Sequence, residues 1–416
     1  MPAFSARRFK SPDSHWWPAY FWLWNDSLDP EVLIEQLHDM FLHDARSVCP
    51  VPMPPEFEPE NFNNQMDPPY LSEGFFQRVR LVVEEAARLG MSYWLYDEGG
   101  WPSGNACGRL LHLRPDLVAK VMRLENGAWV PGEVPRFASL EEAGTRLRHP
   151  DTDLLDPETA LTFMETTYAA YESAVGEHFA RTIMFAFTDE PAFRPVKPGE
   201  EVPWTRGLEE DFRRSFGYSI LDRLNAFSHS SSRLSSRDKE ARIDFFDWVS
   251  RRFRASFLDT LRDWCRRRGL VLTGHLGGEH EALGALEHGF GNVLLALGGM
   301  DAPGIDVISR QIFPGKENPE FVKYASSIAH QKGSPYVVSE SFALYGNGLT
   351  PQQMKWIVDF QYVRGITLLV ISSYPLSTRD HFMPGIRPIF GPVNPLWRYM
   401  PLLHRYIARL GYALSL

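Results

Sequence analysis

The run TIMFAFTDEP, residues 182–191, decides the fold that the sequence predicts. A continuous apolar segment is followed at once by two acids and a proline, the pattern of a strand that is buried on both faces and ends in a turn. Seven other short apolar runs resemble this one. Together they make eight predicted strands: Ala19–Trp24, Ser47–Val51, Ser92–Tyr96, Thr182–Thr188, Leu270–His275, Gly304–Ser309, Tyr336–Ser339 and Ile366–Ser372.

Amphipathic segments separate these strands. A capping residue precedes a proline at the start of four of them: Asp29-Pro30, Asp156-Pro157, Asn318-Pro319 and Thr350-Pro351. Ser72 opens another helix, which Gly90 ends. Eight buried strands alternating with helices predict an α/β fold, a (β/α)8 TIM barrel. An open doubly wound sheet is the alternative, but it needs a glycine-rich phosphate loop after its first strand, where this chain has WNDSLDP.

The length of 416 residues suits one large domain, so we expect a single (β/α)8 catalytic domain over residues 1–416. Residues 126–156 are polar and less periodic and contain proline and glycine, which predicts an insertion after the third strand. The chain ends just after its last predicted barrel helix. We therefore expect no C-terminal β-sandwich domain.

The composition excludes several classes of protein. A net charge of −9 argues against nucleic-acid binding and gives no reason to expect an anionic membrane as partner. The sequence holds no apolar run long enough to span a membrane, and its N-terminus does not resemble a secretory signal. The three cysteines, Cys49, Cys107 and Cys265, are far apart and form no metal-binding pair. These features favour a cytoplasmic protein with free thiols.

Acids recur where a barrel carries its catalytic side chains, at the C-terminal ends of the strands. They follow the third, fourth and seventh predicted strands and lie in the loop after the fifth: Asp97, Glu98, Asp189, Glu190, Glu340 and Glu279. Burying a carboxylate without a partner is costly, so a structural protein has no reason to repeat this pattern. The recurrence of acids at these positions predicts a functional site at the C-terminal end of the barrel.

Glu190 and Glu340 are the predicted catalytic pair. Glycoside hydrolysis uses two carboxylates, one that protonates the leaving oxygen and one that attacks the anomeric carbon or activates a water. We predict Glu190 as the general acid, with its pKa raised by burial or by Asp189, and Glu340 as base or nucleophile. Ser339 and Ser341 are expected to keep Glu340 ionised through hydrogen bonds.

Other residues at the strand ends are predicted to bind substrate. Trp24, Trp101 and Tyr374 are expected to stack on a sugar ring, although packing at the rim is an equal alternative. Polar contacts are expected from a second set: Asn25, Asp97, Glu98, Asp189, His275 and Glu279. HLGGEH, residues 275–280, lacks the spacing of a zinc-binding helix, so we predict hydrogen bonding there and not a transition metal.

Several segments resemble the catalytic barrel of glycoside hydrolase family 106, the α-L-rhamnosidase-like enzymes. They are WLWNDSLDPEVLIEQLHDM (22–40), YDEGGWPSGNACG (96–108), FTDEPAF (187–193), FGYSILDRL (216–224) and SESFALYGNGLTPQQMKWIVDFQYVRGI (339–366). The most specific piece is the run from Asp97 to Gly104. The resemblance extends from about Tyr20 to Leu410 and implies an inverting hydrolase of terminal deoxysugars with a calcium ion near the active site.

Three alternatives stay open. Acids after the fourth and seventh strands also match the retaining barrel glycosidases, of which a β-galactosidase-like enzyme is one. A degenerate barrel that binds sugar without cleaving it is favoured slightly by the eighth strand, which ends in SSYP, residues 372–375. A metal-dependent hydrolase or lyase of another class would use Asp97, Glu98 and Asp189, which are also the expected calcium donors.

Overall fold

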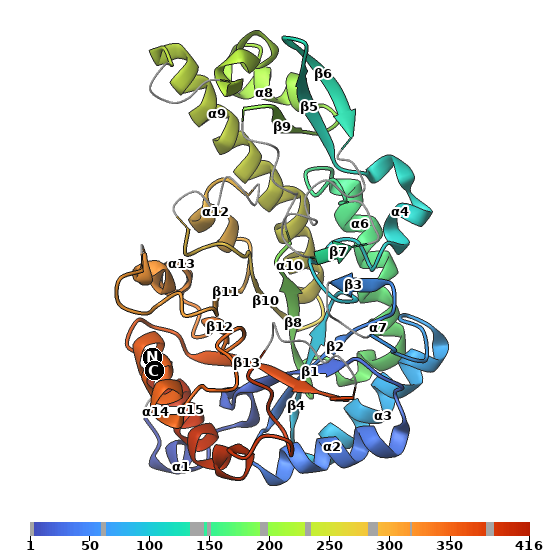
Figure 1. The fold of residues 1–416 in the computed structure, drawn as a ribbon, viewed down its shortest axis with the longest axis vertical. Helices are drawn as coiled ribbons and strands as arrows, with labels where there is room; N and C mark the ends of the chain where they lie inside the picture. Colours follow the sequence, from blue (N-terminus) through green and yellow to red (C-terminus); the bar gives the residue numbers. More distant parts are fainter. Residues whose placement is uncertain are drawn as a thin grey trace.

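The computed structural model describes residues 4–59, 64–133, 145–147, 151–191, 199–228, 234–281, 290–316, 318–379 and 387–416. Within them, eight parallel strands surrounded by helices close into a barrel, which confirms the predicted (β/α)8 fold (Figure 1). The barrel strands are β1 (Ala19–Trp24), β2 (Ser47–Pro52), β4 (Ser92–Tyr96), β8 (Ile183–Asp189), β10 (Val271–His275), β11 (Ala302–Val307), β12 (Val338–Ser341) and β13 (Leu368–Pro375). β13 pairs with β1 and completes the ring.

Two strand boundaries differ from the predicted ones in a way that bears on the site. β12 extends to Ser341, so Glu340 lies inside the strand and not after it. β11 begins at Ala302, so Gly304 lies inside the ladder. A Cβ atom on Gly304 would come within 2.3 Å of the carbonyl oxygen of Gly274 on β10. Only glycine allows the two backbones to approach this closely.

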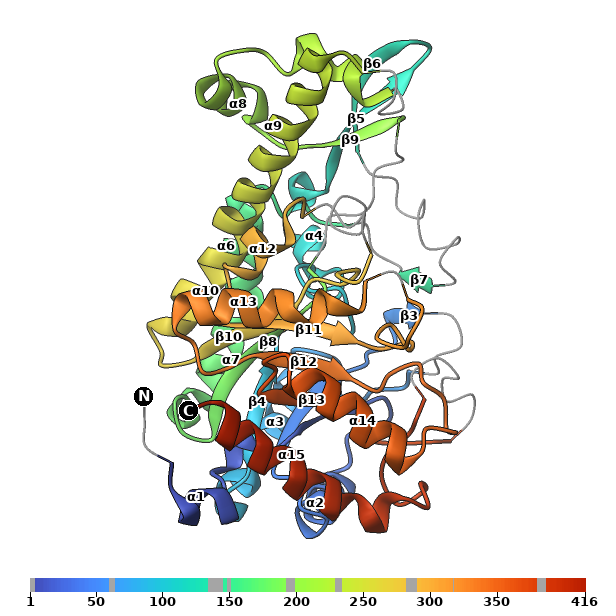
Figure 2. The ribbon, with the colours of Figure 1, turned by 90° about the vertical axis from the view of Figure 1, so that its left-hand side faces the viewer.

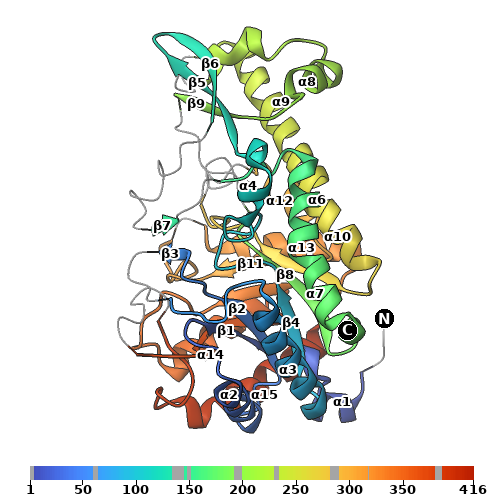
Figure 3. The ribbon, with the colours of Figure 1, turned by 90° about the vertical axis from the view of Figure 1, so that its right-hand side faces the viewer.

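Helices cover the barrel on all sides. α13, α14 and α15 lie on one side (Figure 2), and α2, α3 and α7 lie on the opposite side (Figure 3). The helices of this layer, with the short ones before and between them, are α1 (Ala6–Lys10), α2 (Pro30–Leu42), α3 (Glu73–Leu89), α4 (Arg109–Leu113), α6 (Pro157–Thr166), α7 (Tyr168–Val175), α10 (Asp259–Arg266), α12 (Val293–Leu297), α13 (Lys323–Lys332), α14 (Pro351–Tyr362) and α15 (Met400–Leu414). No helix in the described ranges has the length and hydropathy that a membrane span requires.

Most of the predicted helix starts are confirmed. The side chain of Asp29 caps α2, Ser72 caps α3, and Thr350 forms a capping box at the start of α14. Asp156 also caps its predicted helix, α6, and a break at Thr167 separates α6 from α7. The prediction for Asn318 was wrong in detail, because its side chain makes no capping hydrogen bond and the proline after it starts a short 3₁₀ turn before α13.

An extension projects from the barrel and makes the molecule elongated (Figure 1). Its sheet contains the antiparallel hairpin of β5 (Lys120–Glu125) and β6 (Ala128–Glu133), and β9 (Glu201–Trp204) pairs with β5. α8 (Leu208–Phe216) and α9 (Ser236–Phe253) pack beside it, and α9 continues through a π-helical turn into α10. The extension is therefore built from the segments after both β4 and β8. The predicted insertion, 126–156, overlaps only part of it, and residues 134–144 and 148–150 lie outside the described residues.

Aromatic side chains fill the barrel below its C-terminal end. The ring of Phe187 on β8 lies 5.2 Å from that of Phe21 and 6.1 Å from that of Tyr96, measured between centroids. The same ring lies 5.8 Å from the imidazole of His275. A dry, closely packed floor of this kind excludes water from one side of the polar groups above it and strengthens their electrostatic interactions.

Candidate active site

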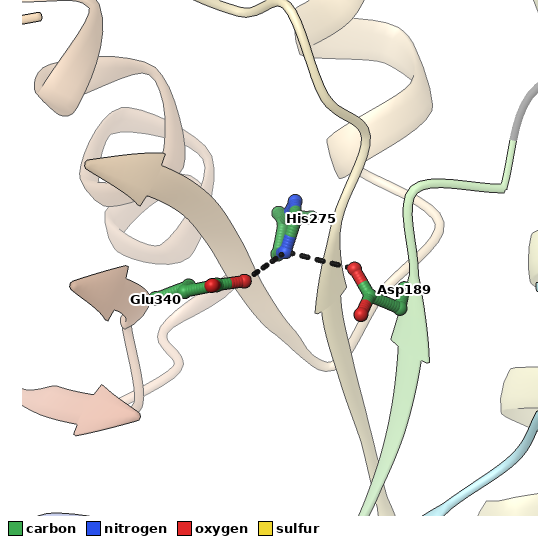
Figure 4. A group of neighbouring side chains, drawn as sticks. All are labelled: Asp189, His275 and Glu340. Atoms are coloured by element: carbon green, nitrogen blue, oxygen red, sulfur yellow. Dashed lines mark hydrogen bonds and ion pairs between the residues drawn. The ribbon is translucent and has the colours of Figure 1, made fainter. Parts of the chain in front are cut away.

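Asp189, His275 and Glu340 meet at the C-terminal end of the barrel (Figure 4). The Nε2 atom of His275 lies 3.1 Å from Oδ1 of Asp189 and 3.1 Å from Oε2 of Glu340. Burial lowers the pKa of His275, but the hydrogen bonds and charges of Asp189, Glu340 and Asp306 outweigh it and raise this pKa well above the usual value. The ring is therefore held as an imidazolium between the two carboxylates.

Glu190 and Asp306 bring two more carboxyl groups to the same histidine. One ligand atom each of Glu190, His275 and Asp306 lies within 4.8 Å of the other two. Asp306 on β11 is the register partner of Glu340 on β12, so both side chains leave the sheet on the same face. We call Asp189, Glu190, His275, Asp306 and Glu340 the His275 cluster.

The backbone of Glu190 is held in a strained conformation. Its φ angle is +45°, in the left-handed region that residues other than glycine rarely occupy. Its N–H donates to the carbonyl oxygen of His275 over 3.1 Å, and a Cβ atom on Gly277 would lie 3.2 Å from its Oε1. Burial and the charges of Asp189, Glu340 and Glu279 raise the pKa of Glu190 to about 8, against the opposing charge of His275. Glu190 therefore keeps its proton at neutral pH.

Glu340 has more partners that stabilise its ionised form. Burial and the charge of Asp189 hold its pKa above the usual value, although hydrogen bonds from His275 and Ser372 lower it. The predicted contribution of Ser339 and Ser341 was wrong. The hydroxyl of Ser339 donates to the backbone carbonyl of Glu340 and contacts the hydroxyl of Ser341, because alternate residues of a strand face opposite sides.

Asp189 is fixed from behind by side chains at the end of β4 and in the loop that follows it. Its Oδ2 accepts a hydrogen bond of 2.5 Å from the hydroxyl of Tyr96, and its backbone N–H donates to Oγ of Ser103 over 2.7 Å. Ser103 in turn donates to Oδ1 of Asp97, whose Oδ2 accepts from the hydroxyl of Tyr168. Burial raises the pKa of Asp97 to about 8. Asp97 therefore supports Asp189 from below. The predicted role in substrate binding would require Asp97 to face the cluster, and it does not.

Glu98 organises the loop of residues 99–107 and is not placed to bind substrate. Its two oxygens accept hydrogen bonds of 2.5–3.1 Å from five backbone N–H groups, those of Gly99, Gly104, Asn105, Ala106 and Cys107. A buried carboxylate with five donors is the centre of a folded loop. The run DEGGWPSG is thus explained by loop architecture.

Three of the four other predicted contacts face away from the cluster. Trp24 is fully buried between Trp22 and Phe75, 5.7 Å and 5.9 Å away. The hydroxyl of Tyr374 donates to Asp39 of α2 on the outside of the barrel. The side-chain amide of Asn25 joins two loops by bonding both the N–H and the carbonyl of Ser377.

Trp101 is half-buried and lines a small pocket beside the loop after β4. Its ring packs against Phe57 at 4.7 Å, and Glu98 and Thr152 line the same pocket. This location corresponds to the rim packing that the sequence left as an equal alternative to sugar stacking.

Five predicted residues lie where expected, and one residue of the cluster was missed. Asp189, Glu190 and Glu340 surround His275 in the cluster. Glu279 accepts hydrogen bonds from the N–H groups of Leu276 and Gly277 close to it. Asp306 lies within the predicted strand Gly304–Ser309 and was not among the predicted site residues. The signal that marks it is an acid in an otherwise apolar run, GIDV, since a buried acid needs a partner or a function.

The cluster has unused oxygen donors for a cation. Among the described residues, Oδ1 of Asp306 and Oε2 of Glu279 are buried and meet no hydrogen-bond donor. Such oxygens are the ligands that calcium prefers. The donors that the sequence suggested, Asp97, Glu98 and Asp189, fit worse, because hydroxyl and backbone donors already occupy Asp97 and Glu98.

Comparisons with known proteins give one weak sequence relative and clear structural ones. No protein-family model matches the chain. A protein of Formosa agariphila named "Putative beta-glucuronidase" is 27% identical over 226 residues, which are 51% of this chain and 18% of that protein. The rhamnosidase structure from Novosphingobium sp. PP1Y has a TM-score of 0.69 and 13% identity, covering 100% of this chain and 61% of its own.

The catalytic domain of the β-amylase from Paenibacillus polymyxa is also similar, with a TM-score of 0.51 and 10% identity over 85% of this chain and 92% of that domain. At these identities the two solved structures share the fold of this chain and nothing more specific. The chain spans less than two thirds of the rhamnosidase and about a fifth of the Formosa protein.

Proposed function

We propose that this barrel is a glycoside hydrolase that removes a terminal, uncharged deoxysugar, with the inverting, α-L-rhamnosidase-like chemistry of family 106. The observation that carries the proposal is the His275 cluster, in which Glu190 is protonated at neutral pH while Glu340 receives hydrogen bonds from His275 and Ser372. Acid–base cleavage of a glycoside requires one carboxyl group that holds its proton and a second that can accept one.

In the proposed reaction Glu190 donates its proton to the glycosidic oxygen as the bond from that oxygen to the anomeric carbon breaks. Glu340 accepts a proton from a water whose oxygen forms the new bond to the anomeric carbon. The free sugar and an alcohol are released, and solvent returns the proton from Glu340 to Glu190. His275 does not touch the bond that breaks. It positions Glu340 and lowers the pKa of that carboxyl.

A neutral sugar fits this site better than a uronic acid. The His275 cluster holds four acids and one histidine, so a sugar carboxylate entering it would meet like charges at short range. The name of the Formosa protein nevertheless makes a β-glucuronidase the second candidate. A retaining, β-galactosidase-like reaction would use Glu340 as the nucleophile.

We further propose that calcium binds beside the cluster, held by Asp306 and Glu279, whose free oxygens support it. When bound, such a cation supplies a positive centre that coordinates sugar hydroxyls. The residues of the chain then do the remaining work: Glu190 moves the proton and Glu340 orients the water. Addition of calcium to the EDTA-treated protein is expected to raise its melting temperature, and an Asp306→Asn variant is expected to lose this rise. An equal rise in both proteins would exclude Asp306 as a ligand.

A small panel of substrates tests the activity. We expect turnover of para-nitrophenyl α-L-rhamnoside and much less of the β-D-glucuronide and β-D-galactoside. Glu190→Gln is expected to reduce turnover at least ~10²-fold on substrates with poor leaving groups and less on activated ones, which need little protonation. Equal losses on both kinds of substrate would remove Glu190 from the role of acid.

Glu340→Ala gives the second test. We expect this variant to lose turnover with its fold intact, and azide to restore part of the rate by occupying the vacated space. The configuration of the azide product shows on which face of the sugar Glu340 acts. Near-native activity of Glu340→Ala would disprove the pair. Failure of the wild-type protein to cleave any sugar of the panel, while still binding one, would favour the non-catalytic sugar-binding barrel.

A further inference from the structure

Three aromatic rings form a strip beside the His275 cluster. Tyr345 lies in the loop after β12, Phe313 in the loop after β11 and Trp356 on α14. The ring centroids of Tyr345 and Phe313 are 6.0 Å apart, and those of Phe313 and Trp356 are 5.2 Å apart. The rings therefore pack against one another in one continuous row, which we call the aromatic strip.

The inner end of the strip is adjacent to the cluster. The backbone N–H of Phe342, three residues before Tyr345, donates to the carbonyl of Val307, the residue after Asp306, over 3.4 Å. Burial raises the pKa of the Tyr345 hydroxyl, and the nearby charge of Asp306 raises it further. Asp306 in turn lies within 4.8 Å of Glu190 and His275 by its nearest oxygen. The outer end of the strip is open to solvent, since Trp356 is 39% exposed. The strip thus leads from the proposed acid to the surface.

The hydroxyl of Tyr345 has no acceptor in the described part of the chain. Tyr345 is only 5% exposed, and no described residue accepts the proton of its hydroxyl. The backbone N–H of Arg310 faces the phenolic oxygen and lowers the pKa of the hydroxyl, but it is a donor and leaves the hydroxyl proton without an acceptor. A buried donor without an acceptor is destabilising. Packing and the Arg310 contact therefore explain the ring and the oxygen of Tyr345 but not its unpaired proton.

The two loops that carry the inner rings are tied together. The backbone N–H of Ser309, after β11, donates to the carbonyl of Ala343, after β12, over 3.1 Å. Phe342 and Leu344 have φ angles of +81° and +63°, so the backbone on each side of this bond follows an uncommon path. The orientation of the Tyr345 ring is thus fixed before any ligand binds, which lowers the entropic cost of binding.

We propose that the aromatic strip is a subsite for the sugar ring that follows the terminal sugar, on the leaving-group side of the bond that Glu190 protonates. This proposal rests on the proposed glycosidase function. The acid must lie at the glycosidic oxygen. The strip begins beside Asp306, whose nearest oxygen lies within 4.8 Å of Glu190. Sugar ring carbons stack on Trp356 and Phe313, and a ring hydroxyl accepts the proton of Tyr345. The preferred substrate is therefore a disaccharide or a longer chain.

Two substrates with the same terminal sugar separate the subsite from the catalytic chemistry. Rutinose carries rhamnose on a glucose ring that can occupy the strip, whereas α-L-rhamnosyl fluoride has no second ring. We expect the ratio of kcat/KM for rutinose to that for the fluoride to fall about tenfold or more in Tyr345→Phe and in Trp356→Ala. Tyr399→Ala, which removes an exposed aromatic ring outside the strip, is the matched control and is expected to leave the ratio unchanged.

The outcomes distinguish the two levels of the argument. An unchanged ratio in both strip variants, in an enzyme that cleaves rhamnosides, overturns the subsite and leaves the proposed function intact. If the wild-type protein cleaves neither substrate, the proposed function fails, and saturation-transfer NMR with rutinose decides the subsite. Contact of the glucose ring in the wild type that is lost in Trp356→Ala supports it, and the absence of glucose-ring contact in the wild type overturns it. Tyr345→Phe also carries its own folding control. It removes both a donor without an acceptor and a contact to the Arg310 backbone, so the melting temperature is expected to change little.

Discussion

The raised pKa of Glu190 predicts how the stability of the protein depends on pH, and this test needs no substrate. The pKa of this carboxyl rises from 4.5 to about 8 on folding. Below pH 4.5 the folded and unfolded chains both hold the proton. As the pH increases from 4.5 to 8, only the unfolded chain releases it, so folding becomes less favourable by about 1.4 kcal/mol per pH unit. The total reaches roughly 5 kcal/mol as an upper value.

Glu190→Gln removes the titration and keeps the size of the side chain. We expect the free energy of unfolding of the variant to exceed that of the wild type by an amount that is near zero at about pH 4.5, increases with pH and levels off near pH 8. Because the cluster carboxyls titrate together, the observed increase is expected to be smaller than the upper value, about 2–4 kcal/mol. Urea unfolding in EDTA, at intervals of half a pH unit, measures it.

Asp116→Asn is the matched control, because hydrogen bonds from Arg114 lower the pKa of Asp116 to about 2. Its stabilising effect is present above the usual pKa of 3.8 and is lost as the pH falls toward 2, so the difference between this variant and the wild type is expected to be constant from pH 5.5 to 8. A constant difference for Glu190→Gln over the same range, or one that decreases, would refute the assignment of Glu190 as a proton carrier.

Three further predictions concern the surroundings of Glu190. His275→Gln keeps a neutral N–H donor but removes the positive charge, so we expect the acidic limb of the pH–rate profile to shift to higher pH by about one to three units. The same change at the neutral, buried His404 is expected to leave the profile unchanged. Glu98→Ala leaves five N–H groups without their acceptor, so we expect the free energy of unfolding to fall by at least ~3 kcal/mol and amide exchange over residues 99–107 to become faster. Exchange at the wild-type rate would mean that the loop keeps its conformation without Glu98. Gly274→Ala places a Cβ atom 1.9 Å from a carbonyl oxygen of β8, so we expect the free energy of unfolding to fall by at least ~3 kcal/mol. Gly90→Ala, with no atom within 4 Å of the new Cβ, is expected to lower it by about 1 kcal/mol. Equal losses of free energy in urea unfolding would show that the barrel adjusts without strain.

The barrel was predictable because its signal is repeated along the whole chain. Each of the eight apolar runs is weak evidence alone, but their alternation with capped amphipathic segments fits a closed parallel barrel better than an open sheet. The ends of β11 and β12 were less predictable. Gly304 looks like a strand breaker until the approach to Gly274 on the neighbouring strand is known, and that approach is a property of the closed ring.

The direction in which strand-end side chains point could not be predicted from the sequence. In a half-buried strand, alternation of polar and apolar residues shows which face is inside. A barrel strand is buried on both faces, and Ala19–Trp24 is fully buried throughout, so the alternation carries no signal. Trp24 and Tyr374 were therefore expected at the mouth, although both face the helical layer. Asp306 lies on the inner face and was left out for the same reason.

Burying the acids of the His275 cluster close together costs free energy, and the same closeness couples their protonation states. Four carboxyl groups share one imidazolium on a dry aromatic floor, and such a group is stable at neutral pH only if part of its negative charge is neutralised. Protons on Glu190 and Asp306 are one means, and a cation beside Asp306 and Glu279 is another. The two would compete for the same charge, so the proposed cation beside Asp306 would lower the pKa of Glu190 toward the pH at which it gives its proton most readily. Such a cation would tie the protonation of the proposed acid to the occupancy of the site.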